Sequence, residues 1–230
     1  MITRLFSWLG GEFIALSTEG SPGESAAEAA QGIFTRFDET LRGLGLTLEC
    51  AVRTRLWTTD RESRDRASDV RFKRLSGAAR ASSSSFIAPD RFQSDARVAL
   101  DMIAMKPPRP GGRKTVVEYD PPKRPCRYVA VDGFVFLTGE ESKKALRPVL
   151  ADQWREIYSL LTDTLAQAGA SWAETARVSC FLHRSQDPAA LRAMMANDVK
   201  TEIPFMEIAW VDDYALPGGL LEVEVTAKRR

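Results

Sequence analysis

The chain has 230 residues, of which 44% are hydrophobic, so it has ample material for packed cores and is not expected to be disordered. Its 32 basic and 31 acidic residues give a formal charge of +1, which gives no electrostatic reason to expect nucleic acid as a partner. Three scattered cysteines, Cys50, Cys126 and Cys180, favour a reducing compartment and exclude a disulfide framework.

The N-terminal residues 1–12 lack the long apolar core of a signal peptide. No window of the sequence approaches the roughly 20 apolar residues that a membrane-spanning helix needs. We therefore expect a cytoplasmic protein without a membrane partner.

Hydrophobic periodicity predicts the first elements of the chain. Alternation over residues 6–17 indicates two strands, and apolar positions at i, i+3 and i+4 predict a helix over 24–42, which Gly45 helps to end. Residues 50–58 alternate as a strand does. The charged stretch 61–75 predicts a second helix, whose interleaved signs favour ion pairs on a solvated face over a phosphate-binding patch.

The stretch 77–87 contains one arginine, Arg80, followed by a run of serines. A Pro-Asp turn and a second strand-like run at 96–104 come next, so we expect a hairpin with Arg80 near its start. The resulting order, β, β, α, β, α, β, β, implies a mixed sheet with both helices packed on one face.

A segment rich in proline and glycine, residues 107–113, predicts a linker between a first domain at 1–106 and a second at 114–230. The second half repeats the pattern of the first. Its predicted elements are strands at 114–119, 127–131 and 134–139, a helix at 149–168, a strand at 176–182, a helix starting at 187–188, and strands at 203–210 and 220–227.

Matched residues recur at a fixed distance along the chain. Gly45 and Gly169 end corresponding helices, and Arg53 and Arg177 lie in corresponding strands; both pairs are 124 residues apart. A constant offset through a helix end and a strand predicts an internal duplication.

The most specific motif is the closing pattern Pro-x-Arg, Leu-Pro, Glu-x-Glu-x-x-Ala. The first half matches its arginine through Ala79-Arg80, and the second half matches the remainder through Leu216-Pro217, Glu222, Glu224 and Ala227. Together with the strand ends at Leu16-Ser17 and Leu137-Thr138-Gly139, these residues resemble the RidA (YjgF) family of reactive-intermediate deaminases.

The resemblance implies an α+β fold of two tandem chorismate-mutase-like (RidA-type) domains, each a mixed β-sheet with two helices packed on one face. It also implies a homotrimer with sites between neighbouring domains. In the family, an arginine binds the carboxylate of a 2-imino or 2-enamino acid, and a glutamate positions the water that hydrolyses it. By this resemblance, Arg80, Ser82, Ser17 and Thr138 are the expected substrate-binding residues.

Neither half contains the full set of family residues. The second half keeps the catalytic glutamate, Glu222, but has Met206 where the motif has arginine. The first half has Ala99 at the glutamate position, with Asp101 two residues further on as a second candidate catalytic acid. A thioether cannot hold a carboxylate, and a methyl group cannot activate water.

Simpler interpretations of the same residues stay open. Arg80 is also compatible with a surface arginine, and Glu222 and Glu224 with a solvated strand edge. The serines 82–85 lack a base nearby and favour a polar strand that lines a pocket. His183, the single histidine, lies three residues after Cys180 and on the opposite face of a strand, so neither a Cys-His dyad nor a metal site is expected.

Two functions follow. The first is a divergent hydrolase or deaminase that acts on a small carboxylate-bearing imine or enamine without a cofactor. The second is a non-catalytic protein that binds a small anion or serves as a scaffold after losing its water-activating glutamate. The two differ in whether an acid lies within hydrogen-bond reach of the bound carboxylate compound.

Overall fold

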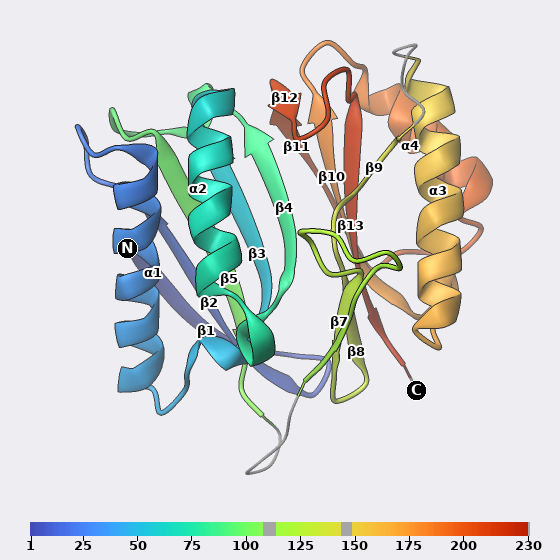
Figure 1. The fold of residues 1–230 in the computed structure, drawn as a ribbon. Helices are drawn as coiled ribbons and strands as arrows, with labels where there is room; N and C mark the ends of the chain where they lie inside the picture. The colour runs from blue at the N-terminus through green and yellow to red at the C-terminus, as the bar shows by residue number, and fades with distance from the viewer. Residues whose placement is uncertain (108–113, 144–148, 230) are drawn as a thin grey trace. The chain divides into compact units, whose positions relative to one another are not determined.

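The computed structural model of the protein describes residues 1–107, 114–143 and 149–229 (Figure 1). Its contacts divide the chain into two units, Met1–Asp132 and Gly133–Arg230. The predicted linker at 107–113 lies outside the described residues apart from Pro107, so the domain boundary at that point stays a prediction. None of the described helices is both long enough and apolar enough to span a bilayer.

The first unit contains a mixed sheet with the order β1-β2-β5-β3-β4, in which β3 and β4 run parallel and the other pairs antiparallel. Its strands are β1 (Ile2–Trp8), β2 (Gly11–Glu19), β3 (Ala51–Thr58), β4 (Ser82–Ile87) and β5 (Val98–Met105). A further antiparallel pair, β6 (Thr115–Val117) and β7 (Tyr128–Val131), follows in the same unit.

Helices α1 (Ala26–Gly43) and α2 (Arg61–Arg74) lie on one side of this sheet (Figure 1). Ser25 and Glu28 form a capping box at the start of α1, and the Asp60 carboxylate accepts from the Ser63 amide at the start of α2. The core between helices and sheet includes Leu16 and Leu100. Because side chains alternate along a strand, the neighbouring residues 17 and 101 point to the opposite face, which we call the helix-free face.

The predicted hairpin between residues 77–87 and 96–104 is wrong. β4 pairs with β3 from one side, in parallel, and β5 pairs with β3 from the other side. The turn after β4 is present as a 3-10 turn at Pro89–Arg91, but the chain then crosses β3. Residues of β3 are buried almost throughout, so this strand needs partners along both of its edges, which a local turn signal does not reveal.

The second unit has the strand order β11-β10-β13-β8, and a short strand, β9, also pairs with β13. β11 runs parallel to one edge of β10 and β13 pairs antiparallel with the other edge, as β4 and β5 do with β3. Its elements are β8 (Phe134–Leu137), β9 (Glu140–Glu141), α3 (Leu150–Gln167), β10 (Thr175–His183), α4 (Pro188–Asp198), β11 (Phe205–Val211), β12 (Asp213–Tyr214) and β13 (Leu221–Lys228). The two mixed sheets and four described α-helices confirm the predicted α+β class.

Irregular features of the backbone repeat at the predicted offset. The 3-10 turns Leu48–Cys50 and Trp172–Glu174 are 124 residues apart. So are the bulges of β3 and β10, each of which skips the residue before an arginine, Arg53 or Arg177. A bulge is a local feature that two unrelated strands do not share by chance at matched positions, so it confirms the internal duplication.

We predict opposite effects of two alanine substitutions on the first unit. At Gly20 a Cβ would lie 2.6 Å from the Cβ of Ala29 in α1, so Gly20→Ala should reduce the free energy of unfolding by about 1–3 kcal/mol. At Gly32, inside α1, the nearest neighbour is a terminal nitrogen of Arg36 at 3.8 Å, and Gly32→Ala should add about 0.5–1 kcal/mol through helix propensity. Urea unfolding measures both; a neutral Gly20→Ala would contradict the predicted close packing.

Candidate functional site

The carboxylate of Asp101, on the helix-free face of the first unit, has three hydrogen-bond donors around it. It accepts from the Ser17 hydroxyl at 2.6 Å, the Trp57 indole nitrogen at 2.7 Å and Nη2 of Arg91 at 2.9 Å. These donors come from β2, β3 and the turn after β4, so three separate segments hold one carboxylate. The structure thus brings together two predicted site residues, Ser17 and Asp101, and adds two that were not predicted.

Arg91 lies over the aromatic ring of Trp57, with its guanidinium carbon 4.0 Å from the ring centre. Glu19 anchors the segment after it, accepting from the Gln93 amide at 2.9 Å and the Ser94 hydroxyl at 2.6 Å. The Arg91 side chain nevertheless stays 43% exposed, and that of Asp101 24% exposed. An acid and a cation therefore lie side by side in fixed positions and remain accessible to solvent.

Arg80 has a different environment. Its guanidinium makes a two-point ion pair with Glu118 and donates to the backbone carbonyls of Lys123 at 3.0 Å and Arg124 at 2.8 Å. The Phe72 ring lies 5.3 Å from its guanidinium carbon, and the side chain is only 14% exposed. The carboxylate that Arg80 binds in this structure is thus one of the chain's own.

The serine run contacts protein groups. Ser82 is fully buried, and its hydroxyl donates to the Val52 carbonyl at 2.9 Å. Arg71, also buried, donates to the Ser84 carbonyl and to the Ser85 hydroxyl, both at 2.6 Å. These contacts satisfy backbone groups that the sheet leaves exposed. Ser82 therefore stands apart from the Asp101 cluster.

In the second unit, Thr138, Glu222 and Glu224 are all buried. Their burial rules out the interpretation of the two glutamates as a solvated edge. Burial, with a smaller contribution from the charge of Glu222, raises the pKa of Tyr214, whose hydroxyl donates to the Phe181 carbonyl at 2.9 Å. The acid of the second repeat is thus enclosed, whereas Asp101 is not.

Strand register identifies which residues correspond between the repeats. Asp101 pairs with Arg55 and Glu224 with Ser179, which are 124 residues apart, so Asp101 corresponds to Glu224 and, by the same register, Ala99 to Glu222. Both repeats therefore have an acid at the position that Asp101 shares with Glu224, whereas only the second repeat has one at the position that Ala99 shares with Glu222.

Strand register also changes which residue of the second repeat corresponds to Arg80. Arg53 pairs with Ser82, and Arg177 pairs with Phe205. Two residues before each partner stand Arg80 and Ile203. The motif-based match of Arg80 with Met206 is therefore wrong, although the second repeat still lacks the arginine.

No cysteine-histidine dyad forms among the described residues. The Cys180 thiol lies 3.7 Å from the Met195 sulfur, and burial raises its pKa to about 12. The Nδ1 atom of His183 lies 2.8 Å from the Ser185 hydroxyl instead. Among residues 1–107, 114–143 and 149–229, no three His, Cys, Asp or Glu side chains are grouped as a metal site requires.

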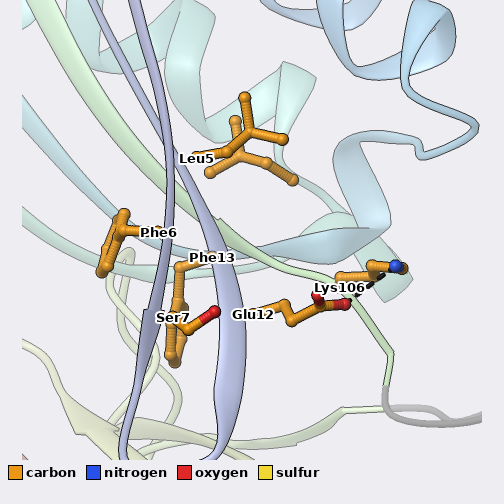
Figure 2. Close-up of a pocket in the computed structure, with 7 residues that line it drawn as sticks. Leu5, Phe6, Ser7, Glu12, Phe13 and Lys106 are labelled. Carbon is orange, nitrogen blue, oxygen red and sulfur yellow. Dashed lines mark ion pairs between the residues drawn. The ribbon is translucent and has the colours of Figure 1, made fainter.

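A hollow of about 340 Å³ lies along β1 and β2. Figure 2 shows Leu5, Phe6 and Phe13 beside it, with Glu12 and Lys106 joined in an ion pair of 2.8 Å. None of the predicted site residues lines this hollow, and its charged groups neutralise each other. It does not resemble a site for an anionic ligand.

Trp57, Arg91 and Glu118 are the residues that sequence reasoning missed. Strand alternation places Trp57 on the same face as Arg55, and that signal was available from the sequence. Arg91 lies in a turn, and Glu118 lies 38 residues after its partner Arg80, so neither position follows from local pattern.

Comparison of the sequence with models of known protein families gives no match, and neither does comparison with curated proteins. Comparison of the structure with solved structures does give matches. A crystal structure of chorismatase aligns with 97% of this chain and 79% of its own, at 15% identity and a TM-score of 0.61.

Smaller proteins align with single halves. A Mycobacterium tuberculosis member of the YjgF/YER057c/UK114 family covers 50% of this chain and 98% of its own, with 22% identity and a TM-score of 0.41. Yeast Mmf1 covers 51% and 99%, with 20% identity and a TM-score of 0.46. The chain therefore shares the fold of chorismatase along nearly its whole length, and structures of the RidA (YjgF/UK114) family each match about half of it.

Proposed function

We propose that the chain is a hydrolase that acts on a small carboxylate-bearing imine or enamine at the helix-free face of its first unit. The supporting observation is the contact between Asp101 and Arg91, where a fixed acid and a partly exposed guanidinium meet. Asp101 occupies only Nη2 of Arg91, and a guanidinium has five N–H donors, so the others can receive a substrate carboxylate.

In this proposal Asp101 accepts a proton from water while the water oxygen attacks the imine carbon. The imine nitrogen takes up a proton, which gives a carbinolamine. Its collapse breaks the carbon–nitrogen bond and releases ammonia and a keto acid, so one water is consumed for each ammonia formed. Ser17 and Trp57 keep the Asp101 carboxylate oriented, and Arg91 fixes the substrate beside it.

The contacts of Arg80 favour the non-catalytic alternative, a protein that binds a small anion or serves as a scaffold. Its ion pair with Glu118 and its two carbonyl contacts are those of an arginine that stabilises its own chain. The substrate-binding role of Arg80 remains a proposal that requires Glu118 to leave. The roles of Ser82, Thr138 and Glu222 likewise remain proposals, and their burial requires that the protein open before a ligand reaches them.

Chorismate is a second candidate substrate, favoured by the likeness to chorismatase over 97% of the chain. It is a carboxylate compound with an enol ether, and an enol ether hydrolyses through the same steps as an enamine: a proton adds to one carbon and water to the next. The Asp101 and Arg91 pair offers the groups for either substrate, so chorismate belongs in the substrate panel.

We also propose that the protein is a cytoplasmic homotrimer. Cys50, Cys126 and Cys180 form no disulfide with one another in the described part of the chain, which fits a reducing compartment. In β1, Ile2 is 57% and Leu5 67% exposed, which is apolar surface that a neighbouring copy would cover. Light scattering should give three times the mass of the chain at micromolar concentration; a stable monomer would contradict the proposal.

Substitution of Arg91 should weaken carboxylate binding. A charge-assisted hydrogen bond contributes about 1.5–3 kcal/mol, so Arg91→Ala should lower the affinity for benzoate or 2-oxobutanoate by roughly ten- to a hundredfold in calorimetry. Arg80→Ala is the matched control and should leave the affinity unchanged. The opposite pattern would place the ligand at Arg80 instead, and Glu118→Gln should then strengthen binding.

Substitution of Asp101 should affect turnover and spare binding. Asp101→Asn keeps the shape of the side chain but removes the base, so kcat for release of ammonia from a 2-imino acid should fall about a hundredfold or more. Asp95→Asn changes an exposed carboxylate in the same segment and serves as the control. Equal rates above that of the reaction without protein would contradict the role of Asp101, and rates no higher than that would favour the non-catalytic alternative.

A further inference from the structure

Lys114 has a partly buried amine that the proposed function does not use. Its ammonium group donates to the backbone carbonyl of Ala51, the residue before the bulge of β3. It also lines a cavity of about 310 Å³ in the first unit, together with residues of the 3-10 turn Leu48–Cys50 and with Met105 at the end of β5. A partly buried ammonium group beside a cavity is unusual, because lysine side chains are mostly exposed.

The walls of this cavity are partly apolar and partly polar, and Thr47 is among the polar residues. Val52, Met105 and Val131 contribute to them, and Glu49 and Cys50 supply the polar part beside Lys114. A volume near 300 Å³ is the lower end of the range for ligand pockets, so it suits a molecule of about one ring. Glu49 disfavours an anionic ligand and Lys114 a cationic one, so the mixed lining favours a small uncharged ligand with one polar group.

The amine of Lys114 is available as a nucleophile near neutral pH. Burial lowers its pKa to about 8, although Cys126, Cys50 and Glu49 around it oppose the shift. The folded-state pKa is lowered, so the neutral amine becomes dominant as pH rises through about 8, well below the pH at which an exposed lysine loses its proton.

We propose that Lys114 captures a small uncharged aldehyde or ketone in this cavity as a Schiff base. The Nζ lone pair attacks the carbonyl carbon, and the carbonyl oxygen takes a proton to form a carbinolamine. That oxygen then leaves as water while nitrogen gives up its second proton, so one amine and one carbonyl yield one imine and one water. The site is separate from Asp101, and this proposal does not depend on the proposed hydrolase activity.

The test uses the full chain with benzaldehyde and sodium cyanoborohydride, whose hydride reduces the imine to a stable secondary amine. Peptide mass spectrometry then measures the rate of benzylation at each lysine between pH 6 and 9. At pH 7 Lys114 should react faster than exposed Lys73 of α2 by on the order of tenfold to a hundredfold, because more of it is neutral. Its rate should level off above about pH 8.

Two variants complete the experiment. Lys114→Arg keeps the cation and the donor to Ala51 but cannot form an imine, so fast benzylation should disappear. Lys73→Arg should leave it unchanged. If Lys114→Arg does not fold, the site-resolved rates of the wild type decide the question. Benzylation of Lys114 no faster than that of Lys73, or no levelling near pH 8, would overturn the proposal.

Discussion

A one-residue bulge in β3 determines the geometry of the first unit. Val52 is the extra residue between Ala51, which pairs with Ala104, and Arg53, which pairs with Ile103. The bulge disrupts the ladder locally, and two side chains from elsewhere in the chain supply donors: Ser82 to the Val52 carbonyl and Lys114 to the Ala51 carbonyl.

Beyond the bulge, strand alternation turns Leu56 toward the core and Trp57 toward the helix-free face. Trp57 then reaches Asp101 of the neighbouring strand β5 and provides the surface on which Arg91 lies. The acid, the cation and the amine of Lys114 therefore all contact residues of β3. The matching bulge in β10 indicates that the bulge came from the ancestor of both repeats, while the residues around it diverged.

Arg80 and Arg91, both in the first unit, show how similar groups acquire different roles. Arg80 has three acceptors from its own chain and is mostly buried, so its binding capacity is largely used. Arg91 is more exposed and gives one nitrogen to Asp101. Ion pairs between exposed groups contribute little to the stability of a fold. Stability alone therefore gives little reason for the arrangement of Arg91 beside Asp101.

Much of the fold could be predicted from the sequence because it depends on local periodicity. The helix at 24–42 and the strand at 50–58 correspond to α1 and β3 within one or two residues. The pairing of β4 and β5 with β3 could not be predicted, because alternation identifies a strand but not its neighbours. For the candidate site, the sequence named Ser17 and Asp101, which the structure places in contact, whereas the Arg80–Glu118 contact depends on segments 38 residues apart.

If the chain binds a small carboxylate beside Asp101, a crystal structure of the protein soaked with benzoate should show where it lies. We expect the benzoate carboxylate on the guanidinium of Arg91, with the contacts of Asp101 to Ser17 and Trp57 retained. Benzoate on Arg80 with Glu118 displaced, or no benzoate near Arg91, would contradict this expectation.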